Sequence, residues 1–285
     1  MPPAVDDILA EQPLRTPLLM GIINVTPDSF SDGGQYLAAP AAVAAGCRLA
    51  AEGAHLLDIG AESTRPGSQR VDAEEQIRRL DGIVQPLAGM DVEGDCPPPL
   101  LSVDTTSARV AEWALDAGAA MINDISAGRE DSGMFSLLAE RGAPVCLRRM
   151  RGTPATMPEG AADEDVVAEV ADFLARRLAA AEAAGIDPAR VLLDPGIGFG
   201  KRLAHNLALL GRLERLVALG RPVLIGVSRK GMIGQLTGRV EPQERTAGTI
   251  GACLAAWAKG ARVFRVHDVA PLADALATYR AVCEA

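Results

Sequence analysis

Polar residues that could bind a small molecule follow short apolar segments at eight places in the sequence. The clearest example is VLLDPGIGFGK (191–201), in which an apolar segment ends at Asp194 and a glycine-rich loop follows. This loop is not a P-loop, because Pro195 and Arg202 stand where that motif needs Gly and Ser or Thr. Its G-x-G-x-G spacing also differs from the dinucleotide fingerprint. We interpret Asp194 instead as an acceptor of hydrogen bonds from the N–H groups of a ring. The glycines would allow close approach of the backbone, and Lys201 and Arg202 would be solvated charges.

The eight apolar segments all end in polar side chains, which include carboxylate, amide, hydroxyl, imidazole and cationic groups. These residues are Asn24, Asp58, Asp104, Asn123, Arg148 with Arg149, Asp194, Ser228 with Lys230, and Arg265 with His267. Taken singly, each has an ordinary explanation, because Asp and Asn often cap the helix or turn that follows a strand. That explanation applies most directly to Asp104 and to Asn123-Asp124. Polar residues at all eight ends instead favour one shared binding site.

The chemistry of these residues divides into two sets. Asp104, Asn123 and Asp194 offer acceptors for a planar, nitrogen-rich ring, since a carboxylate can accept two parallel, charge-assisted hydrogen bonds. The second set offers cations and donors for an anion, and consists of Arg65, Lys230, Arg265 and His267. Asn24 offers a hard oxygen for Mg²⁺, which takes few protein ligands and shares oxygens with substrate phosphates. A heteroaromatic ring that carries a diphosphate would satisfy both sets.

A repeated unit of helix, glycine and short apolar strand would bring these residues together. Helical patterns at 41–53, 106–118 and 166–185 alternate with apolar runs. The runs lie within residues 17–24, 52–60, 98–104, 117–126, 141–149, 183–196, 219–228 and 259–267. Unalternated apolar strands are typical of covered parallel sheets, and strict strand–helix alternation favours a (β/α)8 TIM barrel over a doubly wound sheet. We expect a single barrel domain at 17–285 after an N-terminal extension at 1–16, with the strand ends at one mouth.

The composition excludes several classes of function. A net charge of −9 over 285 residues argues against general nucleic-acid binding, which needs clustered Lys and Arg. Aromatic residues make up only 3%, which leaves few stacking surfaces for single strands or carbohydrates. The acidic N-terminus lacks a signal-peptide pattern, and no uncharged apolar run reaches the roughly 18 residues of a membrane span. The five cysteines lack metal-ligand spacing. We expect a soluble, cytoplasmic protein with free thiols and neither nucleic-acid nor membrane partners.

Several segments, in order along the chain, resemble the dihydropteroate synthase family of pterin-binding enzymes. The matching segments are GIINVTPDSFSDGG (21–34), LLDIGAESTRPGS (56–68), LSVDTT (101–106), INDISAG (122–128), RGTP (151–154), LLDPGIGFGK (192–201), GVSRK (226–230) and FRVHDV (264–269). Any one of them would be weak support. The resemblance is specific because the segments keep their order from about Leu18 to Val269.

The resemblance implies a barrel, commonly a homodimer, that acts in folate biosynthesis. With Mg²⁺ it would join para-aminobenzoate to 6-hydroxymethyl-7,8-dihydropterin diphosphate, giving 7,8-dihydropteroate and pyrophosphate. The residues implied for the pterin are Asp104, Asn123, Asp194 and, at its edge, Lys230. Those implied for the diphosphate are Asn24, Thr64, Arg265 and His267, of which Asn24 also meets the metal. Those implied for the aminobenzoate are Phe30, Arg65, Pro66, Phe199 and Ser228.

The catalytic residues expected on this basis are Lys230, Arg265 and His267. Loss of pyrophosphate leaves a methylene cation delocalised into the reduced pterin, and the aromatic amine then attacks it. Such a step needs an anion clamp and a fixed ring more than a general base. We therefore interpret His267 as a donor to the anion rather than as a base.

Two positions differ from the family pattern. Members usually have Met-His-Met where this chain has Arg148-Arg149-Met150, and the position of Arg148 normally packs an apolar side chain against the pterin. An arginine there could stack on the ring, turn away, or obstruct the pocket. Gly231 replaces the usual Ser after Ser228-Arg-Lys, which removes a hydroxyl that meets the aminobenzoate, although the helix N-terminus stays available to an anion.

These differences leave other interpretations open. One is a catalytically silent pterin-binding paralogue, which Arg148 and Gly231 suggest. A second is a pterin-dependent methyltransferase domain that works with cobalamin, which would not need the diphosphate clamp. A third is a glycosidase-like barrel with Asp104 and Asp194 as its carboxylate pair. The Ala/Gly-rich stretch 246–257 is a candidate dimer surface, although tight packing within the barrel would explain it equally well.

Overall fold

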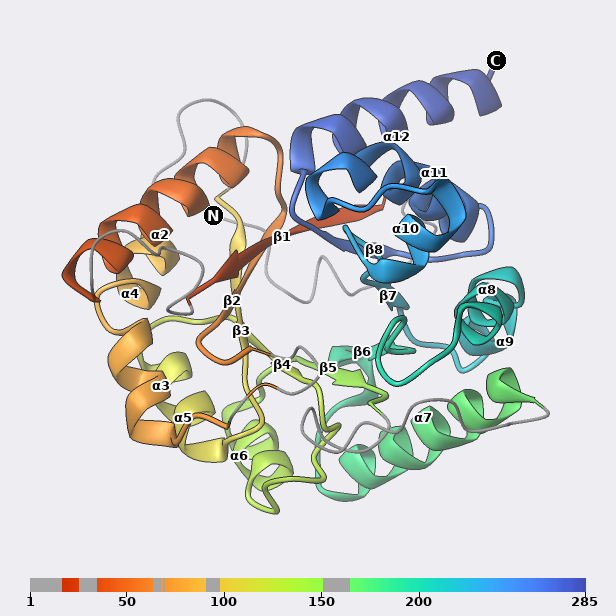
Figure 1. Cartoon of the computed structure of the whole chain (residues 1–285). Coiled ribbons are helices and arrows are strands. Elements are labelled where there is room, and N and C mark those ends of the chain that lie inside the picture. Colours follow the sequence, from red (N-terminus) through yellow and green to blue (C-terminus); the bar gives the residue numbers. More distant parts are fainter. Residues whose placement is uncertain (1–16, 26–34, 64–67, 69, 91–97, 151–164) are drawn as a thin grey trace.

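The structure is a computed structural model that describes residues 17–25, 35–63, 68, 70–90, 98–150 and 165–285. In this part of the chain, parallel strands form a central sheet and helices form a ring around it (Figure 1). This arrangement confirms the (β/α)8 barrel expected from the alternation of patterns. The N-terminal extension at 1–16 lies outside the described residues, so the domain boundary at residue 17 stays a prediction.

The strands and helices alternate along the chain as expected. The strands are β1 (Leu18–Asn24), β2 (Leu56–Gly60), β3 (Leu100–Asp104), β4 (Met121–Asp124), β5 (Val145–Arg148), β6 (Val191–Asp194), β7 (Leu224–Ile225) and β8 (Val263–Val266). The α-helices are α2 (Gln35–Ala51), α3 (Ala73–Leu80), α4 (Val84–Ala88), α5 (Ala108–Asp116), α6 (Met134–Arg141), α7 (Val166–Ala183), α8 (Leu203–Gly211), α9 (Glu214–Val217), α10 (Gly231–Thr237), α11 (Thr246–Trp257) and α12 (Val269–Cys283). Two short 3₁₀ helices, η2 (Pro188–Arg190) and η3 (Pro242–Arg245), complete the set.

Side chains in the connecting loops fix where several helices begin. Ser107 accepts a hydrogen bond from the backbone N–H of Val110 at the start of α5. Asp72 and Asp165 do the same at the first turns of α3 and α7. Such caps satisfy backbone N–H groups that have no partner within the helix. The caps therefore explain why the helices start at these loops, close to the ends of the strands.

The sheet closes into a barrel through its shortest strand. The strand order is β6-β5-β4-β3-β2-β1-β8-β7, and a parallel bridge between Leu193 and Val223 joins the two ends. The backbone N–H of Leu193 also donates to the carbonyl of Pro222 at 3.0 Å. β7 has only two residues, fewer than the apolar run at 219–228 suggested, and after it the chain turns through Arg229, whose φ is 58°. These contacts show that the sheet closes, which the periodicity of the sequence could not establish.

The barrel interior changes from apolar to polar along the strands. The lower interior is a buried cluster of Leu18, Met20, Leu56, Met121, Cys146, Leu192, Leu224 and Val263. Because side chains alternate between the two faces of a strand, the residues two positions later also point inward. These residues are Asp58, Asn123, Arg148, Asp194 and Arg265, with Ser102 and Asp104 on β3. The alternation therefore delivers the polar strand ends to one mouth, above an apolar floor.

A larger apolar core lies between the strands and the surrounding helices, and it includes Leu57, Val103, Leu147 and Leu193 from the outward faces of the strands. No helix in the described ranges is both long and apolar enough to cross a membrane. The cysteines that the structure describes are free thiols: Cys146 and Cys253 are buried, and Cys47 and Cys283 are exposed.

Candidate active site

Asp58 is the deepest charged residue of the mouth. Its carboxylate is fully buried and accepts three hydrogen bonds, from Ser102 Oγ at 2.6 Å, Asn123 Nδ2 at 2.9 Å and Arg265 Nε at 2.6 Å. Asp58 and Ser102 are register partners on β2 and β3. The sequence placed Asp58 at a strand end but gave it no role in the site. The structure shows that it orients Asn123 and Arg265.

Arg148 lies at the centre of the residues assigned to the ring. Its side chain is 2% exposed, and its Nε donates to Asp194 Oδ2 at 2.7 Å. Its Nη2 donates to Asn123 Oδ1 at 3.2 Å, and its Nη1 lies 3.8 Å from Asp104 Oδ2. The three expected acceptors therefore lie together around one planar group, while their role in binding a ring stays a prediction. Arg148 therefore does not turn away from the mouth, and in this position it would obstruct a ring that binds the same acceptors.

The basic and acidic sets are in contact rather than separate. Besides its bond to Asp58, Arg265 approaches Asp104 Oδ2 through Nη2 at 3.4 Å. Its side chain keeps 16% of its surface exposed, so it lies at the outer edge of this cluster. A residue assigned only to an anion thus also contacts Asp104, which was assigned to the ring.

Burial and ion pairing act in opposite directions on these groups. Burial raises the pKa of Asp104 to about 6, although Arg148 lowers it and Asp58 raises it. Burial disfavours the charged form of Arg148, but the carboxylates of Asp194 and Asp104 outweigh that effect and raise its pKa. The guanidinium therefore stays charged at every physiological pH, and it is the main group holding Asp104 ionised.

The capping explanation applies to some strand ends and not to others. Asp124 accepts hydrogen bonds from the backbone N–H groups of Ser126 at 2.7 Å and Gly128 at 2.6 Å, so its role is to hold a turn. Asp104 is not a cap, because Ser107 caps α5. Asp194 has both functions: Oδ1 accepts from the backbone N–H of Gly196 at 2.7 Å, while Oδ2 faces Arg148.

The glycine-rich loop after β6 depends on left-handed backbone conformations. Gly196, Gly198 and Gly200 have φ values of 67°, 81° and 61°, which favour glycine. A Cβ on Gly196 would lie 1.9 Å from the carbonyl oxygen of Arg149. Lys201 Nζ donates to the Gly196 carbonyl at 2.8 Å and to the Phe199 carbonyl at 3.3 Å. The interpretation of Lys201 as a solvated charge is therefore wrong, because its ammonium group ties this loop together.

Phe199 and Lys230 form the side of the mouth next to this loop. Lys230 Nζ donates to the Ile197 carbonyl and lies 4.3 Å from the centre of the Phe199 ring, while the guanidinium carbon of Arg148 lies 5.3 Å from that centre. Burial lowers the pKa of Lys230 to about 7, with Asp194 opposing the shift and Arg148 and Arg265 adding to it. Lys230 can therefore gain or lose a proton near neutral pH.

Ser228 and His267 meet at the ends of β7 and β8. Ser228 Oγ lies 2.9 Å from His267 Nδ1 and accepts a hydrogen bond from the backbone N–H of His267 at 3.1 Å. The sequence assigned these residues to different substrates, and the structure places them side by side. Asn24 ends β1 at the same mouth, and its side chain is exposed.

Several expected site residues cannot be placed. Phe30, Thr64, Arg65 and Pro66 lie outside the described residues, so their roles stay predictions. Arg148 was expected at the mouth as a departure from the family pattern, and the structure shows which side chains it contacts. Its position at a strand end marked it as part of the mouth, but its type gave no indication of which side chains it would contact.

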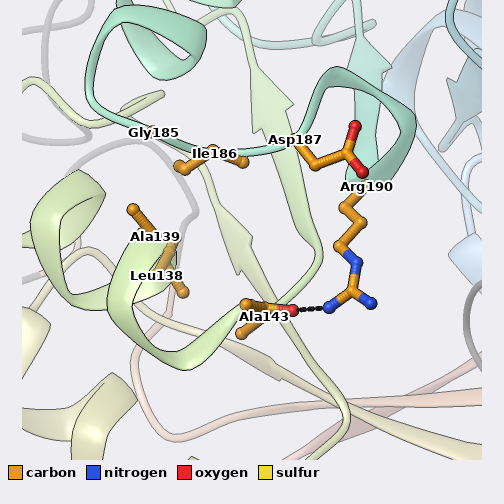
Figure 2. A pocket seen from close by; sticks show the side chains of 8 residues that line it. Leu138, Ala139, Ala143, Gly185, Ile186, Asp187 and Arg190 are labelled. Atoms are coloured by element: carbon orange, nitrogen blue, oxygen red, sulfur yellow. Dashed lines mark hydrogen bonds between the residues drawn. The ribbon is translucent and has the colours of Figure 1, made fainter.

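A separate hollow of about 190 Å³ lies at the opposite end of the barrel (Figure 2). It lies between the end of α6 and the segment that leads into β6, and small or apolar residues such as Ala139, Ala143 and Ile186 line much of it. Arg190 donates to the Gly142 carbonyl there. Its lining residues precede β5 and β6 and include none of the residues of the mouth.

Comparison with known proteins agrees with this geometry. A family model described as "Pterin binding enzyme" matches residues 20–267. Dihydropteroate synthase from Neisseria meningitidis serogroup B is 44% identical over 274 residues, covering 94% of each chain. The enzyme from Escherichia coli K12 is 42% identical over 273 residues, covering 95% of this chain and 94% of its own.

Solved structures give the same result. Dihydropteroate synthase from Xanthomonas albilineans with 4-aminobenzoic acid is similar at a TM-score of 0.87 and 50% identity, covering 95% of this chain and 94% of its own. The same organism's enzyme in complex with 7,8-dihydropteroate gives a TM-score of 0.83 at 47% identity, covering 95% of each chain. Each likeness covers 95% of this chain. The chain therefore belongs to the family of pterin-binding enzymes.

Proposed function

We propose that this chain is a dihydropteroate synthase of folate biosynthesis. It would condense 6-hydroxymethyl-7,8-dihydropterin diphosphate with para-aminobenzoate to give 7,8-dihydropteroate and pyrophosphate. The observation that carries the proposal is that Asp104, Asn123 and Asp194 converge on one position. The planar, nitrogen-rich guanidinium of Arg148 occupies that position in the structure. Relatives with 42–44% identity over nearly the whole chain are named for this activity, which supports the same reading.

The reaction needs the pterin ring to be held in place while the diphosphate leaves its methylene carbon. The acceptors at the centre of the mouth fix the pterin by its N–H groups, and Lys230 lies at the edge of that position. Arg265 and His267, together with Thr64 and Asn24, bind the diphosphate and stabilise the charge that develops on it as the carbon–oxygen bond breaks. The amine of the aminobenzoate then attacks the methylene carbon and loses a proton. Phe30, Arg65, Pro66, Phe199 and Ser228 hold that second substrate in place.

Mg²⁺ belongs to the same proposal. Asn24 has an exposed side chain at the end of β1, and its amide oxygen is a hard ligand that suits this ion. Mg²⁺ takes few protein ligands, so oxygens of the substrate diphosphate would complete the site. When bound, the ion would supply positive charge to the leaving diphosphate.

We also propose a cytoplasmic homodimer. The outer face of α11 carries Ala247, Gly251 and Ala255, which are exposed, while Thr249 and Cys253 on its inner face are buried. Small exposed residues at this spacing would let a second helix approach closely. Sedimentation equilibrium would test this: one species of twice the chain mass is expected, and a monomer at micromolar concentration would contradict it.

The function is tested by pyrophosphate release from the pterin diphosphate, with and without para-aminobenzoate. A synthase releases pyrophosphate only when the amine is present and forms dihydropteroate in equal amount. Release without the amine at the same rate would contradict condensation, because it would indicate simple hydrolysis. Replacing Arg265 with Ala should abolish release, while Arg202→Ala at the exposed start of α8 should leave it unchanged.

The contacts of Arg148 favour a second candidate, a pterin-binding paralogue without turnover. A guanidinium that occupies the ring acceptors would lower the fraction of sites open to substrate. The same assay separates the two: measurable pterin binding with no pyrophosphate release, with or without the amine, would support the silent protein. A cobalamin-linked methyltransferase domain gains no support from relatives that are named dihydropteroate synthases.

A further inference from the structure

Arg148 has a side chain whose chemistry duplicates part of the ligand that its neighbours would bind. A guanidinium is a planar carbon bonded to three nitrogens, all of which are donors. Each nitrogen of Arg148 faces a different residue of the proposed pterin site: Nε faces Asp194, Nη2 faces Asn123, and Nη1 faces Asp104. One side chain thus faces all three residues that are expected to accept hydrogen bonds from the ring.

A pterin contains the same group of atoms. Carbon 2 of its aminopyrimidinone ring is bonded to an exocyclic amino nitrogen and to two ring nitrogens, so these four atoms form a planar unit like a guanidinium. Such a unit can offer N–H donors to carboxylates in the same plane. The Phe199 ring lies 5.3 Å from the guanidinium carbon of Arg148, where it would also be near a flat ring.

We propose that Arg148 is an internal surrogate for the guanidine-like part of the pterin, and that a pterin binds this chain only by displacing that side chain. The inference rests on the proposed function and deepens it. Arg148 stands where the ring would have to lie to reach Asn123, whose Oδ1 accepts from Arg148 and whose Nδ2 donates to Asp58. The Oδ1 of Asp194 is occupied by the Gly196 N–H, which leaves Oδ2 as the atom for which Arg148 and the ring compete.

The displacement is an exchange of donors. Arg148 is 2% exposed and Asp194 is 3% exposed, so removing the guanidinium alone would deprive the buried carboxylate of Asp194 of its cationic partner. A pterin replaces the lost N–H groups as it enters, which makes the exchange possible. Part of the binding free energy of the pterin is nevertheless used to release Arg148. The apparent affinity is therefore lower than it would be at a site without this side chain. Arg148 is therefore a residue that sets pterin affinity.

The test measures binding of 6-hydroxymethylpterin, which lacks the diphosphate, by isothermal titration calorimetry at pH 7.5. Arg148→Met should bind this pterin at least tenfold more tightly than the unmodified chain, because it removes the competing donor. Arg149→Met is the matched control and should change the Kd by less than twofold, since the Arg149 side chain contacts Glu169 and Phe173 instead. Equal or weaker binding by Arg148→Met would overturn the proposal.

A second measurement keeps the test valid if Arg148→Met does not fold. The Nε–H signal of Arg148 can be followed by ¹⁵N NMR in the unmodified chain and assigned by its absence from Arg148→Lys. This N–H is buried and hydrogen-bonded, so we expect slow exchange with water in the free protein. Saturating pterin should shift the signal and speed its exchange at least tenfold. A signal that stays unchanged at saturation would show that Arg148 remains in place.

The outcomes for this inference and for the proposed function are distinguishable. If the unmodified chain condenses its substrates and Arg148→Met binds pterin no more tightly, only the role of Arg148 is wrong. If neither protein binds pterin, the proposed function fails, and the surrogate role fails with it.

Discussion

The ion pair between Arg148 and Asp194 should be one of the strongest side-chain couplings in this chain. With 2.7 Å between Nε and Oδ2, Coulomb's law at an effective dielectric constant of about 20 gives an upper limit of about 6 kcal/mol. The measured coupling should be smaller, because Arg148 keeps Asn123 and Asp104 as neighbours and Asp194 keeps the Gly196 N–H. We expect a coupling free energy of about 2–4 kcal/mol.

A double-mutant cycle of Arg148→Met and Asp194→Asn measures this coupling. Each single change should lower the free energy of unfolding by about 3–5 kcal/mol, because it leaves a buried charge without its partner. The double variant should lose less than the sum. Urea unfolding followed by circular dichroism and by tryptophan fluorescence supplies the free energies, provided that the two transitions coincide.

The matched control is a cycle of Arg149→Met with Asp194→Asn. The side chain of Arg149 contacts Glu169 on α7, and only its backbone N–H reaches the Asp194 carbonyl. Its coupling to Asp194 should be below about 0.5 kcal/mol. A value this small for Arg148 as well would refute the arrangement of the mouth described above, because the guanidinium could not then lie between the carboxylates.

Three further changes test other parts of the site. Gly231→Ser should lower the KM for aminobenzoate roughly threefold or more in steady-state kinetics, because it adds a hydroxyl donor. The new side chain fits, since a Cβ at position 231 has no neighbour within 4 Å. An unchanged KM would contradict this view. Gly196→Ala should lower the free energy of unfolding by roughly 4 kcal/mol or more, because its Cβ would clash with backbone. Gly220 also has a positive φ, 76°, but lies next to open space, so Gly220→Ala should lose only about 1–2 kcal/mol. Equal losses would refute the backbone clash as the cause. Lys230, whose pKa falls to about 7 in the folded protein, destabilises the fold most below pH 7, and this effect fades as pH rises towards its unfolded pKa. The stability advantage of Lys230→Met in urea unfolding should therefore shrink by up to about 2 kcal/mol between pH 7 and pH 9, and a constant difference would show that the pKa is not lowered.

The fold could be predicted because its signals are local and repeated. Each strand reads as a short apolar run after a glycine, and each run ends in polar residues, so the eight units support one another. The same rule located Asp104, Asn123 and Asp194 at one mouth. The extent of β7 could not be predicted in this way, because the apolar run at 219–228 continues past the two residues that pair in the sheet.

The contacts within the mouth could not be predicted, because they depend on the direction of long side chains. Lys201 looked solvated in the sequence and binds two backbone carbonyls in the structure. Asp58 is fully buried and accepts hydrogen bonds from side chains on three different strands. Strand alternation gives the inward direction of Asp58, but the distances that make it a hydrogen-bonding centre appear only when the barrel closes.

The position of Arg148 also explains how the free site can remain folded. Without a ligand and without Arg148, the buried carboxylates of Asp104 and Asp194 would lack the cation that they share, and burial already raises the pKa of Asp104 to about 6. The guanidinium compensates that charge until a ring with matching donors arrives. Its release requires the same free energy whichever ring enters, so it weakens all ring ligands by one factor and leaves the preference between them unchanged.

This reasoning gives a last prediction. 6-Hydroxymethylpterin and guanine share the aminopyrimidinone edge, so both should have a lower Kd for Arg148→Met than for the unmodified chain. The ratio of the two Kd values should agree within twofold between the two proteins. Isothermal titration calorimetry of both ligands on both proteins supplies the ratio. A ratio that changes tenfold would mean that Arg148 contacts one bound ring and not the other. The side chain would then remain inside the occupied pocket, and displacement would be the wrong description of its role.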